Sequence, residues 1–397
     1  MNKKKFHIQD IKYNCIDDDS STLLASLRGW SALIVLLTHA FQVFVLPWFG
    51  LFSWPHLLTS WLACYSVLTF FVVSGFMIAV SVHRHSTSDG FAQWLFLRSR
   101  FLRIYPPLVG SIGLCAVIFF LFRGFGIHGA ESFRLGDELF LSRERVEMGL
   151  SETASTLLLV YTVVPLASGP VQLNGPLWTL TYEWWFYIFA MFAGAAVIGR
   201  RVWFGLVPTG LVLLLFAKSP AGTLLWAFLT VWTAGFVLGV AYLKGLLEHS
   251  RTPLVFLAIA LCAVMGVVAI GRGDTLQIVA EPLQRLGNRA HWTMALVAVL
   301  GACALGMAIR WRWRGIPCGS LADYSYTLYL FHYPILLLTF GLLHSWLHNF
   351  GVLPSVLCAL LVSMLILPIA RLSASILEDR DLFGQLLSTV ITRIKRS

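Results

Sequence analysis

Long apolar runs separated by short polar segments dominate the chain between residues 30 and 375. About 20 apolar residues in a helix are enough to cross the roughly 30 Å hydrocarbon core of a bilayer. The runs predict about ten transmembrane helices, at residues 30–47, 61–82, 104–122, 178–199, 202–217, 223–243, 253–270, 291–309, 321–345 and 352–375. We therefore expect an all-α, polytopic integral membrane protein whose spans surround a polar central cavity.

Polar segments flank and interrupt this transmembrane domain of residues 30–375. We expect residues 1–29 to be a cytoplasmic N-terminal segment and residues 376–397 to be a cytoplasmic basic tail. The longest polar interval, about 123–177, is interpreted as an outer loop that either caps a cavity or is a solvated connector. Its apolar part, 155–166, is too short to span and is interpreted as interfacial or re-entrant.

Composition and charge narrow the class of protein. Hydrophobic residues make up 58% and charged residues 12% of the chain, which excludes a water-soluble globule of this size. Lys and Arg concentrate on segments that share a side with the N-terminus, so the positive-inside rule predicts cytoplasmic termini. This asymmetry explains the net charge of +10 without a nucleic-acid partner. The seven cysteines show no zinc-binding or disulfide spacing, so we expect no metal.

Arg28 and His39 stand out in the first apolar run. Eleven helical residues advance roughly 16 Å and complete about three turns, so both side chains share one face. Ionisable residues within a membrane span usually belong to a functional site. His39 could accept a proton from a hydroxyl group, and Arg28 could bind an anion. The alternatives are a positive-inside anchor for Arg28 and a hydrogen-bonded structural role for His39.

A second group of cations precedes the third apolar run, where Arg98, Arg100 and Arg103 lie in a segment predicted to face the cytoplasm. Guanidinium groups bind phosphates through paired hydrogen bonds. Beside Arg28, these arginines would suit a phosphorylated carrier such as coenzyme A. The alternative ligand is a lipid headgroup.

Glu183 is the acidic residue placed well inside an apolar run, so it should face a cavity or a cation. It could orient His39, bind an acceptor hydroxyl, or pair with an Arg or Tyr for structural reasons. In the ninth span, Ser325, Tyr329 and His332 share one side. His332 could line the same cavity, or the three could form a helix-packing network.

Five motifs follow in order along the chain: LRGWSALIVLLTH, FFVVSGF, RFLRIYPP, GPLWTLTYEWWFY and YSYTLYLFHYPI. In FFVVSGF, the small residues Ser74 and Gly75 most simply permit close helix approach. Together the motifs resemble those of the membrane-bound acyltransferase-3 family over nearly the whole chain. Members of that family are ten-helix bacterial proteins that transfer an acyl group, usually acetyl, from cytoplasmic coenzyme A thioester to a hydroxyl of an extracytoplasmic glycan.

The resemblance implies the same reaction here, in the bacterial inner membrane among its lipids. It implies that His39 and Glu183 are catalytic and that the donor, acetyl-CoA or another acyl-CoA, binds to arginines. We expect the donor-binding residues to be Arg28, Arg98, Arg100 and Arg103. We expect the acceptor, a glycan or lipid-linked saccharide, to contact Trp178, Tyr187, Ser325 and His332.

Several alternatives stay open from the sequence. His39 either deprotonates the acceptor hydroxyl or carries the acyl group itself. The transferred group could be succinyl, and the acceptor could be a small metabolite. A transporter or flippase of a lipid-linked saccharide would also need many spans and buried charges, although no inverted repeat supports it.

Overall fold

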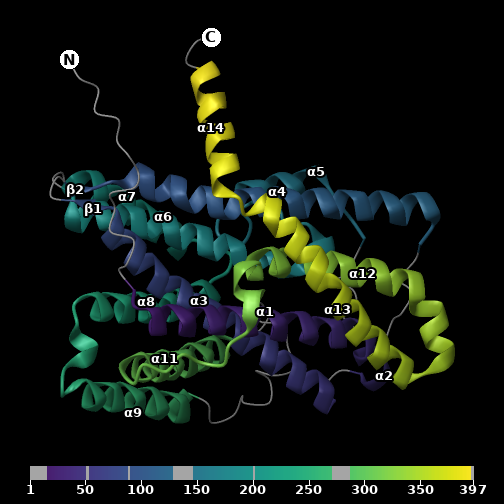
Figure 1. The fold of residues 1–397 in the computed structure, drawn as a ribbon, viewed down its shortest axis with the longest axis horizontal. Helices are drawn as coiled ribbons and strands as arrows, with labels where there is room; N and C mark the ends of the chain where they lie inside the picture. The colour runs from purple at the N-terminus through teal and green to yellow at the C-terminus, as the bar shows by residue number, and fades with distance from the viewer. Residues whose placement is uncertain are drawn as a thin grey trace.

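The computed structural model describes residues 16–50, 53–87, 90–127, 146–199, 202–270 and 287–394. Most of these residues are helical, and the long helices run side by side along the long axis of the molecule (Figure 1). Within the described residues, nine helices are long and apolar enough to cross a membrane, and a shorter apolar helix accompanies them. The expected all-α, polytopic membrane architecture is confirmed.

The long helices are α1 (Asp18–Phe44), α3 (Trp54–Arg84), α4 (Gln93–Phe125), α6 (Trp178–Ile198), α7 (Val202–Ala217), α8 (Thr223–Leu243), α9 (Thr252–Ile270), α11 (Asn288–Arg310), α12 (Ser325–Phe350) and α13 (Val352–Leu377). Shorter helical elements are α2 (Leu46–Phe49), α5 (Leu150–Leu158), η2 (Gln172–Leu177), η3 (Leu246–Glu248), η5 (Gly319–Asp323) and α14 (Arg380–Ile394). A small antiparallel hairpin pairs β1 (Ser86–Thr87) with β2 (Gly90–Phe91).

Helix α7 is the shortest of the ten, yet it connects the two ends of the bundle. It begins at Val202, shortly after α6 ends at Ile198, and the turn after α7 contacts the segment that precedes α6. There, Ser219 Oγ donates to Thr162 O at 2.7 Å, and the amide of Ala221 donates to the same carbonyl at 3.3 Å. The ten predicted spans therefore correspond to ten helices.

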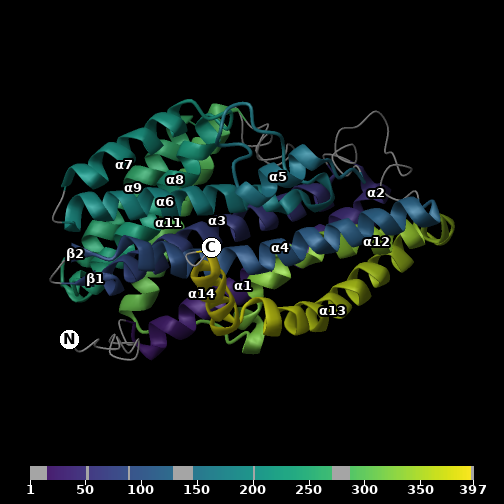
Figure 2. The ribbon, with the colours of Figure 1, turned by 90° about the horizontal axis from the view of Figure 1, so that it is seen from above.

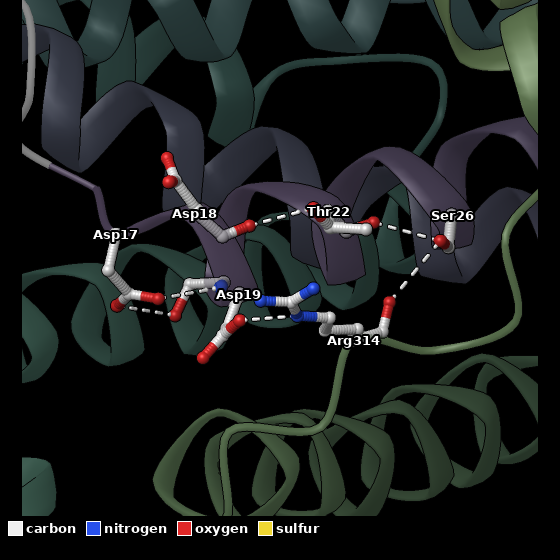
Figure 3. Close-up of polar contacts among 7 residues, drawn as sticks. Asp17, Asp18, Asp19, Thr22, Ser26 and Arg314 are labelled. Carbon is white, nitrogen blue, oxygen red and sulfur yellow. Dashed lines mark hydrogen bonds and ion pairs between the residues drawn. The ribbon is translucent and has the colours of Figure 1, made fainter.

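The opposite end of the bundle gathers the start of α1 and the ends of α8 and α11. Tyr242, near the end of α8, donates to Asp17 at 2.5 Å. Arg314, which follows α11, forms an ion pair with Asp19 at 2.5 Å (Figure 3). These contacts place the start of α1 and the ends of α8 and α11 at the same end of the bundle. This is the arrangement expected when successive spans cross the membrane in alternating directions.

Two helices begin well before the apolar runs that predicted them. Asp17 caps α1 by accepting a hydrogen bond from the amide of Ser20 at 2.8 Å. Arg28 therefore lies inside α1 instead of at its start. Helix α4 begins at Gln93, so Arg100 and Arg103 are helical residues and do not belong to a loop. The apolar runs predicted the spans correctly but not the polar ends of these helices.

Helices α3 and α8 pack closely because each carries a glycine where they cross. A Cβ atom added at Gly75 would lie 2.0 Å from the carbonyl oxygen of Trp232, and one at Gly235 would lie 2.0 Å from that of Val72. Backbones can approach this closely only where side chains are missing. The packing role expected of Gly75 is confirmed.

A buried segment without regular α-helix leads into α6. The apolar stretch after residue 150 forms the short α5, followed by turns and then η2. Asn174 in η2 donates from Nδ2 to Leu330 O at 2.7 Å and to Ser111 Oγ at 2.9 Å. Such backbone is tolerated within a membrane protein where other protein groups satisfy it. These bonds position the start of α6 against α4 and α12. Residues 128–145, which hold most of the charges of the expected outer loop, lie outside the described residues.

The C-terminal tail contains a helix that the sequence did not predict. Helix α14 projects from the bundle, almost perpendicular to the long helices (Figure 1), and is seen nearly end-on in Figure 2. Arg98 of α4 donates to Gly384 O of α14 at 3.3 Å. The side chains of Leu382 and Leu386 are 43% and 53% exposed. This contact joins α14 to the first turns of α4.

Candidate active site

A cavity lies between α1, α3, α4, α6 and α12. Three arginines, Arg28, Arg100 and Arg103, and one carboxylate, Glu183, contribute its charged lining. Hydroxyl groups from Ser, Thr and Tyr side chains complete the polar part, and Val, Leu, Phe and Met side chains form the rest. The lining is thus cationic on balance and can accommodate an anionic molecule with an apolar portion.

Arg28 is held between α1 and the start of α12. Its Nη2 donates to Ala322 O at 2.9 Å and to Ser325 Oγ at 3.5 Å. Ser325 is itself 2% exposed and donates to the same carbonyl at 3.0 Å. The guanidinium of Arg28 is therefore fixed in place, while its other nitrogens remain available to the cavity.

Arg100 and Arg103 reach the cavity from α4 in different ways. The guanidinium of Arg100 lies 6.0 Å from the ring centre of Phe96 and 5.9 Å from that of Tyr187, a cation–π arrangement. Arg103 interacts electrostatically with Glu183 but donates no hydrogen bond to any of the residues that the structure describes. Its donors can therefore bind a ligand.

Glu183 lies opposite these arginines on α6. Its carboxylate accepts hydrogen bonds from the hydroxyl of Tyr187 and, at 3.2 Å, from that of Ser74. All three cavity arginines lie within electrostatic range of it. No ion pair joins it to an arginine among the described residues. Glu183 is stabilised by two hydroxyl donors and balances part of the cationic charge.

His39 of α1 pairs with His332 of α12. The Nδ1 atom of His39 lies 2.8 Å from Nε2 of His332, and the two rings are parallel, with centres 5.1 Å apart. The Nδ1 atom of His332 lies 3.2 Å from Leu328 O. His332 is buried, with 1% exposure, whereas His39 is partly exposed. The edge of the Tyr333 ring packs against His39, with ring centres 5.3 Å apart.

The histidine pair lies behind one wall of the cavity and does not line it. Tyr329 lines the cavity, and its ring centre is 5.9 Å from that of His332 and 6.0 Å from that of Phe70. The Tyr329 hydroxyl donates to Pro176 O at 2.6 Å and lies 2.7 Å from the Thr179 hydroxyl. Tyr329 therefore lies between the charged cavity and His332, and Phe70 packs beside it in the cavity lining.

Two residues predicted to bind donor or acceptor belong neither to the cavity lining nor to the histidine pair. Arg98 is exposed and contacts α14 instead of facing Arg100 and Arg103. Trp178 packs against Phe228 of α8, with ring centres 5.5 Å apart. The structure brings the other predicted residues to the cavity or to the histidine pair.

Of the three roles considered for Glu183, the structure shows pairing with a tyrosine hydroxyl, and Glu183 makes no hydrogen bond to His39. His332 occupies the hydrogen-bonding position next to His39, while Glu183 bonds to Tyr187 and Ser74. The reason is helix packing, because α6 packs against α7, α4 and α3, whereas α1 packs against α3, α12 and α13, so that α12 and not α6 brings a partner to His39. Glu183 thus belongs to the cavity and not to the histidine pair.

Sequence reasoning missed three residues of the cavity region. Ser74 was interpreted as a packing residue, but Gly75 fulfils that role and Ser74 faces Glu183. Tyr326 lines the cavity and donates to Ile104 O at 3.3 Å. Arg380 of α14 lies within electrostatic range of Arg103. The first two lie in motifs already noted, whereas Arg380 had no such signal.

The described residues contain no group of three or more His, Cys, Asp or Glu side chains that could hold a metal ion. A family model described as an acyltransferase domain matches residues 24–370, which include the cavity and the histidine pair. No curated protein and no solved structure shows significant similarity to the chain. A match over nearly the whole chain shows that this membrane protein belongs to the acyltransferase-3 family.

Proposed function

We propose that the protein transfers an acetyl group from cytoplasmic acetyl-CoA to a hydroxyl of an extracytoplasmic or cell-surface polysaccharide. Family membership shows an acyltransferase that acts on a carbohydrate or similar acceptor. The observation that supports the finer proposal is the cavity lined by three arginines and one carboxylate. Tyr329, which lines this cavity, also packs beside His332 of the histidine pair.

The arginine cavity would bind the coenzyme. Coenzyme A carries phosphate groups at one end and an uncharged pantetheine arm at the other, and guanidinium donors match phosphate oxygens well. Arg103 has no hydrogen-bond acceptor among the described residues. Arg28 uses only its Nη2 atom in hydrogen bonds there, so its other nitrogens can donate to a ligand. The apolar lining suits the arm. The proposal requires the arginines to open toward the cytoplasm, as the distribution of basic residues predicts.

Two chemical routes fit a neutral imidazole at residue 39. In the first, His39 takes the proton of the acceptor hydroxyl while its oxygen attacks the thioester carbonyl, and coenzyme A leaves as its thiolate. In the second, His39 attacks the thioester carbonyl and coenzyme A leaves as its thiolate. The acceptor oxygen then attacks the acyl carbonyl, and the imidazole of His39 leaves and takes up the hydroxyl proton. Both routes need the thioester to pass Tyr329, so the proposal requires this side chain to move during turnover.

In this proposal Glu183 belongs to the donor site and does not orient His39. Because it bonds to Tyr187 and Ser74 and faces three arginines, it would order the donor site instead of orienting His39. The negative charge of a single carboxylate would partly offset the mutual repulsion of the arginines before the coenzyme arrives. Its replacement should therefore affect donor binding.

The direct test uses purified protein in lipid vesicles with radiolabelled acetyl-CoA and candidate polysaccharides. We expect label to appear on polysaccharide with wild-type protein and to disappear with His39→Ala. The matched control is His344→Ala, a half-buried histidine further along α12, which should transfer label normally. Transfer by a well-inserted His39→Ala protein would rule out both routes.

Donor and acceptor identity need a separate measurement. Acetyl-CoA and succinyl-CoA are offered together, and the ester on the product is identified by mass spectrometry. Acetyl ester on polysaccharide is expected. Succinyl ester, or label found only on small metabolites, would overturn that part of the proposal while leaving the acyltransferase intact.

A further inference from the structure

The histidine pair has a hydrogen-bond direction that is set by a backbone carbonyl. The Nδ1 atom of His332 lies 3.2 Å from Leu328 O, one turn earlier on α12. A carbonyl oxygen can only accept, so the proton of this bond must belong to Nδ1. A neutral imidazole carries one ring proton, which leaves Nε2 of His332 as a hydrogen-bond acceptor.

The direction of this hydrogen bond also determines which ring nitrogen of His39 carries a proton. Its Nδ1 atom lies 2.8 Å from Nε2 of His332, and an acceptor there requires a proton on Nδ1 of His39. The lone pair of His39 is then on Nε2. That atom makes no hydrogen bond within the part of the chain that the structure describes. His39 is also the more exposed of the two rings.

We infer that His332 is a positioning residue that holds His39 as the Nδ1-protonated tautomer and presents its Nε2 as the reactive nitrogen. The effect on rate rests on the proposed acyl transfer, but the tautomer is a property of the resting protein. Histidines at reactive sites commonly depend on a carboxylate or carbonyl for this orientation. Here a second, neutral imidazole provides it.

The surroundings hold both rings in this arrangement. The rings are parallel to within 2°, and the ring of Tyr333 packs edge-on against His39. Toward the start of α12, Arg28 donates to Ala322 O at 2.9 Å and fixes the register between α1 and the segment that leads into α12. When Nε2 of His39 accepts a proton, its Nδ1–H bond to His332 becomes charge-assisted and stronger.

The primary test is nitrogen NMR on protein labelled with ¹⁵N-histidine, which distinguishes protonated from unprotonated ring nitrogens. The His39 signals are assigned by their loss in His39→Gln. In wild-type protein we expect Nδ1 of His39 to be protonated and Nε2 to be unprotonated. The opposite tautomer in wild-type protein would overturn the inference without any substitution.

Two substitutions of His332 separate hydrogen bonding from packing. His332→Gln retains an acceptor oxygen near the position of Nε2, whereas His332→Leu fills space without one. We expect His39 to keep its tautomer in His332→Gln and to become a mixture of tautomers in His332→Leu. An unchanged tautomer in a folded His332→Leu protein would contradict the inference. If His332→Leu does not fold, His332→Phe takes its place.

Kinetics supply a readout that a purely structural role would not move. His332→Leu should lower kcat by roughly 10²- to 10⁴-fold and leave KM for the acyl donor unchanged, while His332→Gln should stay within about tenfold of wild type. Equal losses in both variants would contradict a positioning role. If wild-type protein transfers no acyl group, the proposed function fails, but the tautomer spectrum still decides the present inference.

Discussion

Helices α1 and α12 meet at two polar places that differ in character. Near the start of α12, Arg28 of α1 reaches Ser325 and the preceding Ala322 beside an open, cationic cavity. Further along, His39 of α1 meets His332 in an aromatic enclosure behind the cavity wall. The same pair of helices thus carries a charged region and a neutral region. We interpret the first as the place of donor binding and the second as the place of bond exchange.

The difference follows from what each task demands. A guanidinium stays charged at every physiological pH and offers several donors, so it suits the binding of a phosphorylated donor. An imidazole can remain neutral with a free lone pair, which a general base or nucleophile needs. Arg103 keeps its donors unpaired among the described residues, whereas His39 has one ring nitrogen committed to His332.

The largest effect should come from removing the reactive ring. His39→Ala should lower kcat for acyl transfer on the order of 10⁴-fold, because both proposed routes pass through this imidazole. Radiolabel transfer in vesicles measures the loss, and donor binding by the same protein should be unchanged. A kcat within tenfold of wild type would break the assignment of chemistry to the neutral region.

A smaller effect is expected from the charged region. Arg103→Gln should raise KM for acetyl-CoA by roughly 10- to 100-fold, since a hydrogen bond to a charged group contributes about 1.5–3 kcal/mol. The matched control is Arg123→Gln, an exposed arginine near the other end of α4, which should leave KM unchanged. Initial rates over a range of donor concentrations distinguish KM from kcat. Equal changes in both variants would show a general effect of charge.

The close packing of α3 against α8 can be weakened without changing any residue of the charged region or of the histidine pair. Gly75→Ala would place a methyl group about 2.0 Å from Trp232 O, so α3 and α8 would have to separate. Overpacking of this kind destabilises by typically about 1–3 kcal/mol. Gly113→Ala in α4 meets no atom within 4 Å and serves as the control. Thermal unfolding in detergent compares the two, and equal midpoints would contradict the close packing.

The smallest predicted effect concerns the support of Glu183. Tyr187→Phe removes one hydroxyl donor to the carboxylate while Ser74 remains. The loss of a single hydrogen bond should destabilise the protein by about 1 kcal/mol and raise donor KM only a few-fold. Ser74→Ala provides a matched comparison. A large fall in kcat for Tyr187→Phe would instead show that Tyr187 takes part in the chemistry.

The sequence predicted the spans because apolar length is a local property of the chain. It also predicted that Arg28 and His39 share a face, since eleven residues of helix fix their relative direction. It did not predict where α1 and α4 begin, because their first turns are polar and are hidden from an apolar pattern. Recognising that α4 starts at Gln93 would have placed Arg98 on another face from Arg100.

The sequence alone could not predict which site residues contact one another. His39 and His332 lie 293 positions apart, and their contact depends on the packing of α1 against α12. Chemistry alone left three roles open for Glu183, and the choice among them depends on which helices α6 packs against. Spacing within one helix predicts which residues share a face, but not which helix that face meets.

The division between donor binding and chemistry is tested most directly by equilibrium binding of a non-reactive acetyl-CoA analogue to His39→Ala and Arg103→Gln proteins. We predict that His39→Ala binds the analogue as tightly as wild type although it transfers no acyl group, and that Arg103→Gln binds it roughly 10- to 100-fold more weakly. Weak binding by His39→Ala together with tight binding by Arg103→Gln would contradict the account.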